Sequence, residues 1–213
     1  VKLYVEGGGD AASLKSACRE GFANFLEKAG FKGKMPRIIA CGSRRNAYES
    51  FCTALKNGDK ALLLVDSEEP ISADLQRGDS SLADIRKQWA PWQHLAKRKG
   101  DEWEKPHDAS DAQCHLMVQC MEAWLLADRE TLKSFFGQGF MEAQLPNISN
   151  AIETVPKQKI YDSLKNATKN CKTKSPYGKG EHSFKILAQI DPQKVIDASP
   201  WAKRFIEAIA CHT

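Results

Sequence analysis

Two pairs of acidic residues follow strand-like segments of this 213-residue chain. Glu6 closes the β-prone segment KLYVE, and Asp10 follows three glycines later, at the expected start of a helix. Asp66 and Glu68 follow the apolar run KALLLV, spaced so that both side chains of an extended chain point to one side. Because glycines let the backbone turn sharply, Glu6 and Asp10 can face the same spot. We predict that all four carboxylates converge.

A cluster of four carboxylates indicates that the protein binds a divalent cation. Four carboxylates at one sheet edge repel one another, and their pKa values rise unless a cation compensates. Oxygen ligands suit Mg²⁺ or Mn²⁺, and one or two such ions can activate water and stabilise a phosphoryl group during transfer. The chemistry indicated is phosphodiester hydrolysis. Neither pair is specific alone, since Asp10 could be a helix N-cap and the other acids could be solvated turn residues.

The elements that must position these acids alternate between strand and helix. An apolar run without alternation, such as residues 60–65, is typical of a central parallel strand covered on both faces. A β-α-β-α-β series predicts a parallel sheet flanked by helices, with sites beyond the carboxyl ends of the strands. The expected elements are strands at 2–6, 37–43 and 60–65, a helix at 11–30, and a helix that Ser43 caps and Asn57-Gly58 ends.

The rest of the chain predicts an insertion and a helical tail. A fourth strand is expected at 115–119, so the fold class is α/β, with a parallel sheet of about four strands. We divide the chain into an α/β core at 1–136, with an insertion at about 71–113, and a helical C-terminal extension at 137–213 packed on the core. The expected helices are 82–97, 120–136, 148–155, 159–170, 184–190 and 201–210.

Composition and charge limit the kinds of partner and cellular location that the sequence predicts. The net charge of +4 is too small to indicate nucleic-acid binding by itself. Lysines crowd residues 157–185, and that face could follow a phosphate backbone or be a solvated surface. The seven scattered cysteines favour reduced thiols over disulfides or structural zinc. No apolar run approaches the roughly 20 residues of a membrane span, and the first residues do not resemble a secretory signal, so we expect a cytoplasmic protein without membrane contact.

Two motifs resemble the toprim signature, a Glu-Gly turn followed by an acidic pair. They are VEGGGD after the first strand and LLLVDSE after the third. Longer segments resemble a toprim-related family, a domain of unknown function often encoded beside ABC-type ATPases, and this resemblance spans nearly the whole chain. Those segments are GSRRNAYESF, VDSEEP, HLMVQCMEAWLLAD and YGKGEHSFKIL.

The resemblance implies roles for individual residues. In the overcoming-lysogenization-defect nucleases, which carry a toprim domain, the turn has a second acid four residues after the first, as Glu6 and Asp10 do here. By that pattern Glu6 and Asp66 hold one metal ion, and the side chains of Asp10 and Glu68 are directed toward a second metal ion. Glu68 departs from the pattern, because many toprim proteins have Asp there.

Further candidates come from the same resemblance and from the sheet edge. Glu122 could be another metal-site acid or a helix N-terminal Glu favoured by the dipole. Lys179 resembles a lysine placed near the scissile phosphate, where it would offset developing charge, or it is an ordinary loop lysine. Arg44 and Arg45 follow the second strand and could bind substrate phosphate through guanidinium forks. No catalytic role is assigned to His115, His182, Trp89, Trp92 or Trp103.

The leading hypothesis is a Mg²⁺- or Mn²⁺-dependent nuclease with Glu6, Asp66, Glu68 and Lys179 as catalytic residues. The resemblance implies an effector of a bacterial anti-phage or stress system with an ABC-type ATPase partner. The sequence leaves open whether the substrate is DNA or RNA and whether the enzyme is an endonuclease or an exonuclease. It also leaves open whether the protein forms a homo-oligomer. The alternative is a non-catalytic regulatory subunit of an ATPase complex. The nuclease hypothesis fails if Glu6 and Asp66 face apart or are locked in ion pairs with arginine or lysine.

Overall fold

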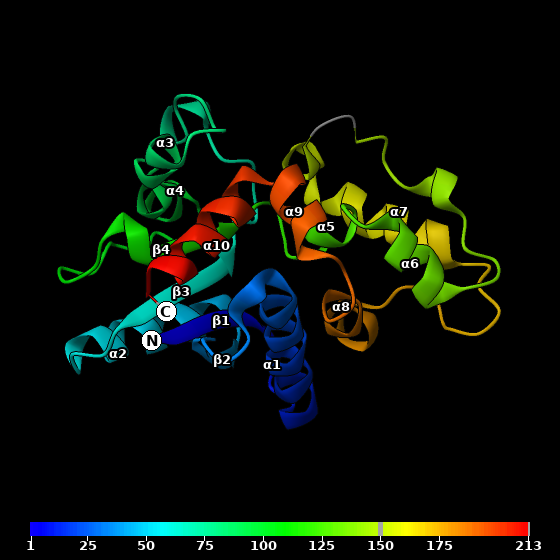
Figure 1. Ribbon diagram of the computed structural model, residues 1–213, viewed down its shortest axis with the longest axis horizontal. Helices are drawn as coiled ribbons and strands as arrows, with labels where there is room; N and C mark the ends of the chain where they lie inside the picture. Colours follow the sequence, from blue (N-terminus) through cyan, green and yellow to red (C-terminus); the bar gives the residue numbers. More distant parts are fainter. Residues whose placement is uncertain (149–150, 213) are drawn as a thin grey trace.

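The computed structural model describes residues 1–148 and 151–212, and its centre is a four-stranded parallel sheet in the order β2-β1-β3-β4 (Figure 1). The sheet is flanked by helices, which confirms the predicted α/β class. All four strands occur where the sequence predicts them, within a few residues. They are β1 (Lys2–Gly8), β2 (Arg37–Gly42), β3 (Ala61–Asp66) and β4 (Cys114–Met117).

The central strand β3 is buried on both faces, as its unbroken apolar sequence predicts. Leu62 and Leu64 belong to one hydrophobic cluster, together with helix α1 (Ala12–Leu26), whereas Leu63 and Val65 belong to a second one. Successive side chains of a strand point to opposite faces, so the two clusters cover opposite sides of the sheet.

The helices form two groups around this sheet. In Figure 1, α6, α7 and α8 lie together to the right of the sheet, whereas α3 and α4 lie above it on the other side. The helix that follows β2 begins after Ser43, whose Oγ accepts a hydrogen bond from Asn46 N at 3.1 Å, as the sequence predicts. The remaining helices are α2 (Arg44–Lys56), α3 (Ala83–Lys87), α4 (Pro91–Lys97), α5 (Glu122–Leu125), α6 (Arg129–Phe136), α7 (Lys157–Thr168), α8 (Lys179–Leu187), α9 (Pro192–Ala198) and α10 (Pro200–His212).

Two of the predicted helices are divided in the structure. The helix expected at 82–97 is α3 and α4, because Pro91 lacks an N–H and occupies the first turn of a new helix. The helix expected at 120–136 is α5 and α6, because the Asp128 carboxylate caps α6 and accepts hydrogen bonds from the backbone N and the hydroxyl of Thr131.

Other differences lie in the tail. The helix expected at 148–155 is a single 3₁₀ turn at Ile152–Thr154, and residues 149–150 of that segment lie outside the described residues. Helix α9 was not predicted; it begins at Pro192 after the capping side chain of Asp191.

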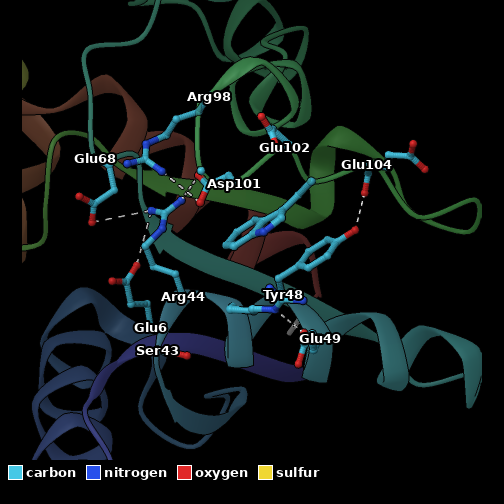
Figure 2. Close-up of a pocket in the computed structure, with 13 residues that line it drawn as sticks. Glu6, Ser43, Arg44, Tyr48, Glu49, Glu68, Arg98, Asp101, Glu102 and Glu104 are labelled. Carbon is cyan, nitrogen blue, oxygen red and sulfur yellow. Dashed lines mark hydrogen bonds and ion pairs between the residues drawn. The ribbon is translucent and has the colours of Figure 1, made fainter.

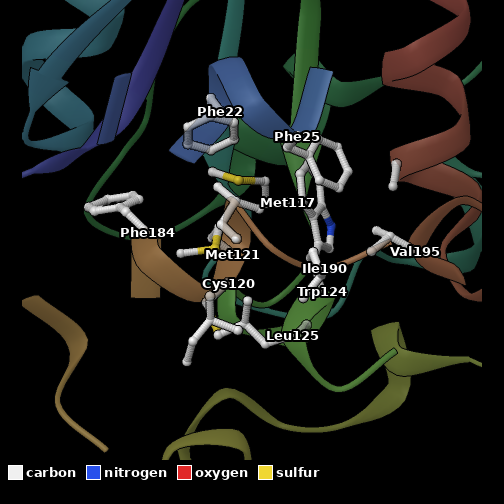
Figure 3. Packing of buried hydrophobic residues seen from close by; sticks show 14 of the residues in the cluster. Phe22, Phe25, Met117, Cys120, Met121, Trp124, Leu125, Phe184, Ile190 and Val195 are labelled. Carbon is white, nitrogen blue, oxygen red and sulfur yellow. The ribbon is translucent and has the colours of Figure 1, made fainter. Parts of the chain in front are cut away.

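The C-terminal helices share a core with the α/β part. Phe25 of α1 stacks on Trp124 of α5 with ring centroids 5.3 Å apart (Figure 3). Trp124 in turn stacks on Phe205 of α10 with ring centroids 6.3 Å apart. Helix α8 packs so closely on α1 that a Cβ at Gly21 would lie 2.8 Å from the Phe184 carbonyl oxygen. The C-terminal helices therefore pack against the sheet domain through one continuous hydrophobic cluster.

Among the described residues, no helix combines the length and the apolar character that crossing a membrane requires. Four of the seven cysteines, Cys18, Cys41, Cys114 and Cys120, are buried as free thiols.

The start of α10 depends on one half-buried carboxylate. Glu153 accepts hydrogen bonds from the Ser199 hydroxyl and, at 3.0 Å, from the Trp201 backbone N. Burial outweighs these two hydrogen bonds and raises the pKa of Glu153 to about 7. The folded protein therefore binds a proton at pH values where an unfolded glutamate has already lost it.

This shift predicts a pH-dependent stability. Because the folded pKa lies above the unfolded one, Glu153 destabilises the fold progressively as pH rises from about 4.5 to about 7, by up to about 3 kcal/mol. A Glu153→Gln variant stays neutral, and its side-chain oxygen can still accept both hydrogen bonds. Measured by urea unfolding, it should gain stability relative to the wild type between pH 5 and pH 8.

The matched control is Glu20→Gln, which neutralises an exposed glutamate on α1. It should follow the wild type at both pH values. A constant difference between Glu153→Gln and the wild type across this range would show that Glu153 titrates normally.

Candidate metal centre

Adjacent strand tips bring Glu6 and Asp66 together. Strands β1 and β3 pair in parallel with Val5 opposite Leu64, so Glu6 follows this pair by one residue and Asp66 by two. The Asp66 backbone N donates a hydrogen bond of 3.0 Å to Glu6 Oε2. Glu6 is half-buried and Asp66 is buried. The two predicted acids thus face each other across neighbouring strands.

Glu68 joins them through a turn. Ser67 N and Glu68 N donate to the carbonyls of Met117 and Gln119, so the chain stays beside β4 after β3 ends. Glu68 then adopts a left-handed backbone with φ of 66°, which is uncommon for a residue with a side chain. The predicted convergence of Asp66 and Glu68 is therefore present, but a strained turn produces it rather than the alternation of an extended strand.

These three carboxylates could hold a metal ion. One oxygen from each of Glu6, Asp66 and Glu68 lies within 4.8 Å of the others. Ligands 2.0–2.1 Å from an octahedral Mg²⁺ lie roughly 3 to 4 Å from one another, so small side-chain rotations would suffice. The donor set is entirely oxygen, which fits Mg²⁺ or Mn²⁺.

Three cations surround the triad. Arg44 Nη1 lies 3.7 Å from Glu6 Oε2 and 4.0 Å from Glu68 Oε1, and it also donates to the Asp66 carbonyl (Figure 2). Lys157 Nζ hydrogen-bonds Glu68 Oε2 at 2.5 Å. Lys179 Nζ lies 3.9 Å from Asp66 Oδ2. Glu6 and Asp66 therefore each form an ion pair, with Arg44 and with Lys179, and both of these ion pairs are longer than a hydrogen bond.

The charges in the site shift one another's pKa values. Burial raises the pKa of Asp66 well above its ordinary value, and the charges of Glu6 and Glu122 raise it further. Burial and the neighbouring Glu68 raise the pKa of Glu6, against the opposing effect of Arg44. Burial also opposes ionisation of Glu68, but the hydrogen bond and charge of Lys157 hold its pKa below the usual range. Positive charge therefore compensates Glu68 more fully than it compensates the two acids on the strand tips.

Glu122 lies behind Asp66 rather than inside the triad. It is fully buried and accepts hydrogen bonds from Tyr161 at 3.0 Å, Ser183 at 3.1 Å and Tyr177 at 3.3 Å. Tyr161 OH also accepts a hydrogen bond of 3.1 Å from Lys179 Nζ, which lies 3.9 Å from Glu122 Oε2. Glu122 therefore sits where it anchors Lys179 beside Asp66.

Two other predicted site residues lie outside the cluster. Asp10 is exposed, and the residue that caps α1 is Ala11, so Asp10 neither joins the triad nor caps the helix. Arg45 is exposed and pairs with Glu49 one turn later in α2. Of the two predicted phosphate-binding arginines, only Arg44 contacts the triad.

Cavities open on both sides of Glu6. The larger one, about 740 Å³, is lined by Glu6, Glu68 and Arg44, by the stacked rings of Tyr48 and Trp103, and by exposed acids at its rim (Figure 2). The smaller one measures about 340 Å³. Its lining includes Glu6, Asp66, Lys179, Met121, Gly42 and the glycines at positions 7–9.

The family model for DUF4276, described as a domain of unknown function, matches residues 5–210. The chain belongs to this family. Comparison with curated proteins gives no match, and neither does comparison with solved structures. The matched region of this DUF4276 chain runs from the residue before Glu6 to well beyond Lys179, so it includes the triad and its neighbouring cations.

Sequence reasoning missed several residues of this DUF4276 site. Asp101 is nearly buried and pairs with Arg44 and, at 3.1 Å, with Arg98, but its segment KRKGDEWEKP is typical of a surface loop. Tyr161 and Tyr177 lie in the tail, where only chain folding brings them to Glu122. Lys157 falls in the predicted lysine-rich span, yet nothing in the sequence pairs it with Glu68.

The triad predicts metal-dependent stabilisation. At 100 times the dissociation constant, an ion that binds only the folded protein stabilises it by about 2.7 kcal/mol. Mn²⁺ should therefore raise the melting temperature of the wild type, and Asp66→Asn should abolish that increase. Asp10→Asn should keep it, because Asp10 lies outside the triad, and Glu20→Gln serves as the matched control.

The readout is differential scanning fluorimetry with and without MnCl₂. Loss of the Mn²⁺ effect in Asp10→Asn with retention in Asp66→Asn would place the ion elsewhere than the triad.

Proposed function

We propose that this chain is a metal-dependent nuclease that hydrolyses phosphodiester bonds of DNA or RNA at a toprim-like centre. The observation that carries the proposal is the convergence of Glu6, Asp66 and Glu68, with ligand oxygens within 4.8 Å of one another at the carboxyl ends of adjacent parallel strands. Three carboxylates and no nitrogen or sulfur donor favour hard cations such as Mg²⁺ or Mn²⁺.

Each residue of the site takes a distinct role in this proposal. A divalent ion bound to the triad would polarise a phosphoryl oxygen and lower the pKa of a water molecule. Lys179 projects its ammonium group beside Asp66 with about half of the side chain exposed, so it could contact a phosphate oxygen and offset charge that develops there. The Tyr161 hydroxyl and the Glu122 carboxylate hold that lysine in place.

The glycines beside the triad allow the chain to pack closely around the smaller cavity. A Cβ at Gly42 would lie 2.5 Å from the Gly9 carbonyl oxygen, and one at Gly7 would lie 2.8 Å from the Phe184 ring. Both glycines have positive φ and line the smaller cavity together with Lys179. A side chain at either position would collide with the protein itself, so these glycines are needed for the close packing of the chain that lines the smaller cavity.

One observation favours the alternative, a regulatory subunit that does not cut. Arg44, Lys157 and Lys179 place three positive charges within 4.0 Å of the three triad carboxylates, so the cluster is partly compensated without an ion. The ABC-type ATPase partner and the anti-phage or stress role rest on the sequence resemblance and stay predictions under either function.

The test is hydrolysis of bis(4-nitrophenyl) phosphate, duplex DNA, single-stranded DNA and tRNA with Mg²⁺ or Mn²⁺. We expect metal-dependent cleavage of at least one nucleic acid. Asp66→Asn and Lys179→Gln should each lower the rate by a factor of about 100 or more, since each removes a group that stabilises the transition state.

The matched control Glu20→Gln should retain the wild-type rate. Cleavage that persists in EDTA, or that Asp66→Asn leaves unchanged, would contradict the nuclease mechanism. Absence of cleavage together with absence of Mn²⁺ binding would favour the regulatory alternative.

A further inference from the structure

Helix α7 carries a ridge of residues that starts at the triad and leads away from it. Lys157, Tyr161, Lys165 and Lys169 are spaced four residues apart, and side chains at this spacing form one oblique row on a helix. Lys157 bonds Glu68 and Tyr161 bonds Glu122, so this end of the row belongs to the site. Lys165 and Lys169, at the other end, are exposed.

Exposed lysines in residues 157–185 are available to bind a partner. The span 157–185 holds eight lysines and two acids. Lys165, Lys169 and Lys172 are exposed, and no ion pair involves any of them within the part of the chain that the structure describes. Exposed ammonium groups without acidic partners remain available to neutralise an external polyanion.

The larger cavity, beside the triad, is lined by both acids and arginines. Of its exposed acids, Glu49 pairs with Arg45, whereas no ion pair involves Glu102 or Glu104 within the described part of the chain (Figure 2). Glu102 and Glu104 would repel a phosphate backbone that reaches the triad, and the unpaired lysines of the α7 region would attract it. Charge complementarity therefore selects the α7 side for the continuation of the substrate.

We propose that Lys165, Lys169 and Lys172 form a track that binds the phosphate backbone of a nucleic acid whose scissile phosphate lies at the triad. The choice of nucleic acid as the partner rests on the proposed function. From Lys157 at the triad to Lys169 just after α7 the chain rises about 18 Å. Successive phosphates of one DNA strand lie about 3.4 Å apart along the duplex axis, so a backbone that runs from the triad to the track would pass about five of them.

The test measures binding of a 20-base-pair DNA duplex, and of its single strand, by fluorescence anisotropy in EDTA at several salt concentrations. The track variant is K165Q/K169Q/K172Q. The control is K34Q/K56Q/K60Q, which removes the same charge from exposed lysines beside the opposite ends of the strands. For the duplex, the track variant should bind at least about tenfold more weakly, and its slope of log K against log[salt] should be shallower by about 2 to 3.

Three results would overturn the track. The first is that the wild type does not bind DNA, and the second is that both triple variants lose the same amount of DNA affinity. The third is that the track variant loses more affinity for phosphatidylglycerol vesicles than for nucleic acid, which would assign these lysines to a membrane. Hydrolysis of bis(4-nitrophenyl) phosphate by the same proteins separates the two proposals, because that small diester does not reach the track. Intact hydrolysis with unchanged DNA binding would reject the track alone, whereas track-dependent binding without hydrolysis would reject the nuclease alone.

Discussion

The parallel pairing of β1 with β3 forces two acidic side chains against each other at a buried sheet edge. The hydrogen bond from Asp66 N to Glu6 Oε2 fixes that contact, and the turn at Glu68 adds a third carboxylate. Like charges in such a place are costly unless they are compensated. The surroundings can be understood as that compensation, since the nearest cations come from α2, α7 and the start of α8.

The helical tail is consequently part of the site and not an appendage to it. Lys157 and Lys179 lie beyond residue 136, and so do the hydroxyl groups of Tyr161, Tyr177 and Ser183 that hold Glu122. The shared hydrophobic cluster around Trp124 attaches this tail to the sheet domain, which keeps both lysines at the strand tips. Packing far from the carboxylates thereby determines how their charge is balanced.

Local patterns predicted the sheet and the two acids at its edge, because strand tips follow from hydrophobic runs and glycine turns. Asp10 shows the limit of that reasoning: its spacing predicts a place beside Glu6, whereas in the structure it is exposed and lies outside the triad. The breaks at Pro91 and Asp128 depend on local chemistry that the helical periodicity conceals. Asp101 and Tyr161 reach the site through tertiary contacts, for which one sequence gives no signal.

The proposed function depends on a hard dication binding between the acids of β1 and β3. Anomalous scattering from crystals soaked in MnCl₂ tests this most directly, because it locates manganese independently of activity. We predict a peak within ligand distance of Glu6, Asp66 and Glu68, with Arg44 displaced from Glu6 and Glu68. A density map with no peak there, and with the Arg44 guanidinium still between these carboxylates, would contradict it.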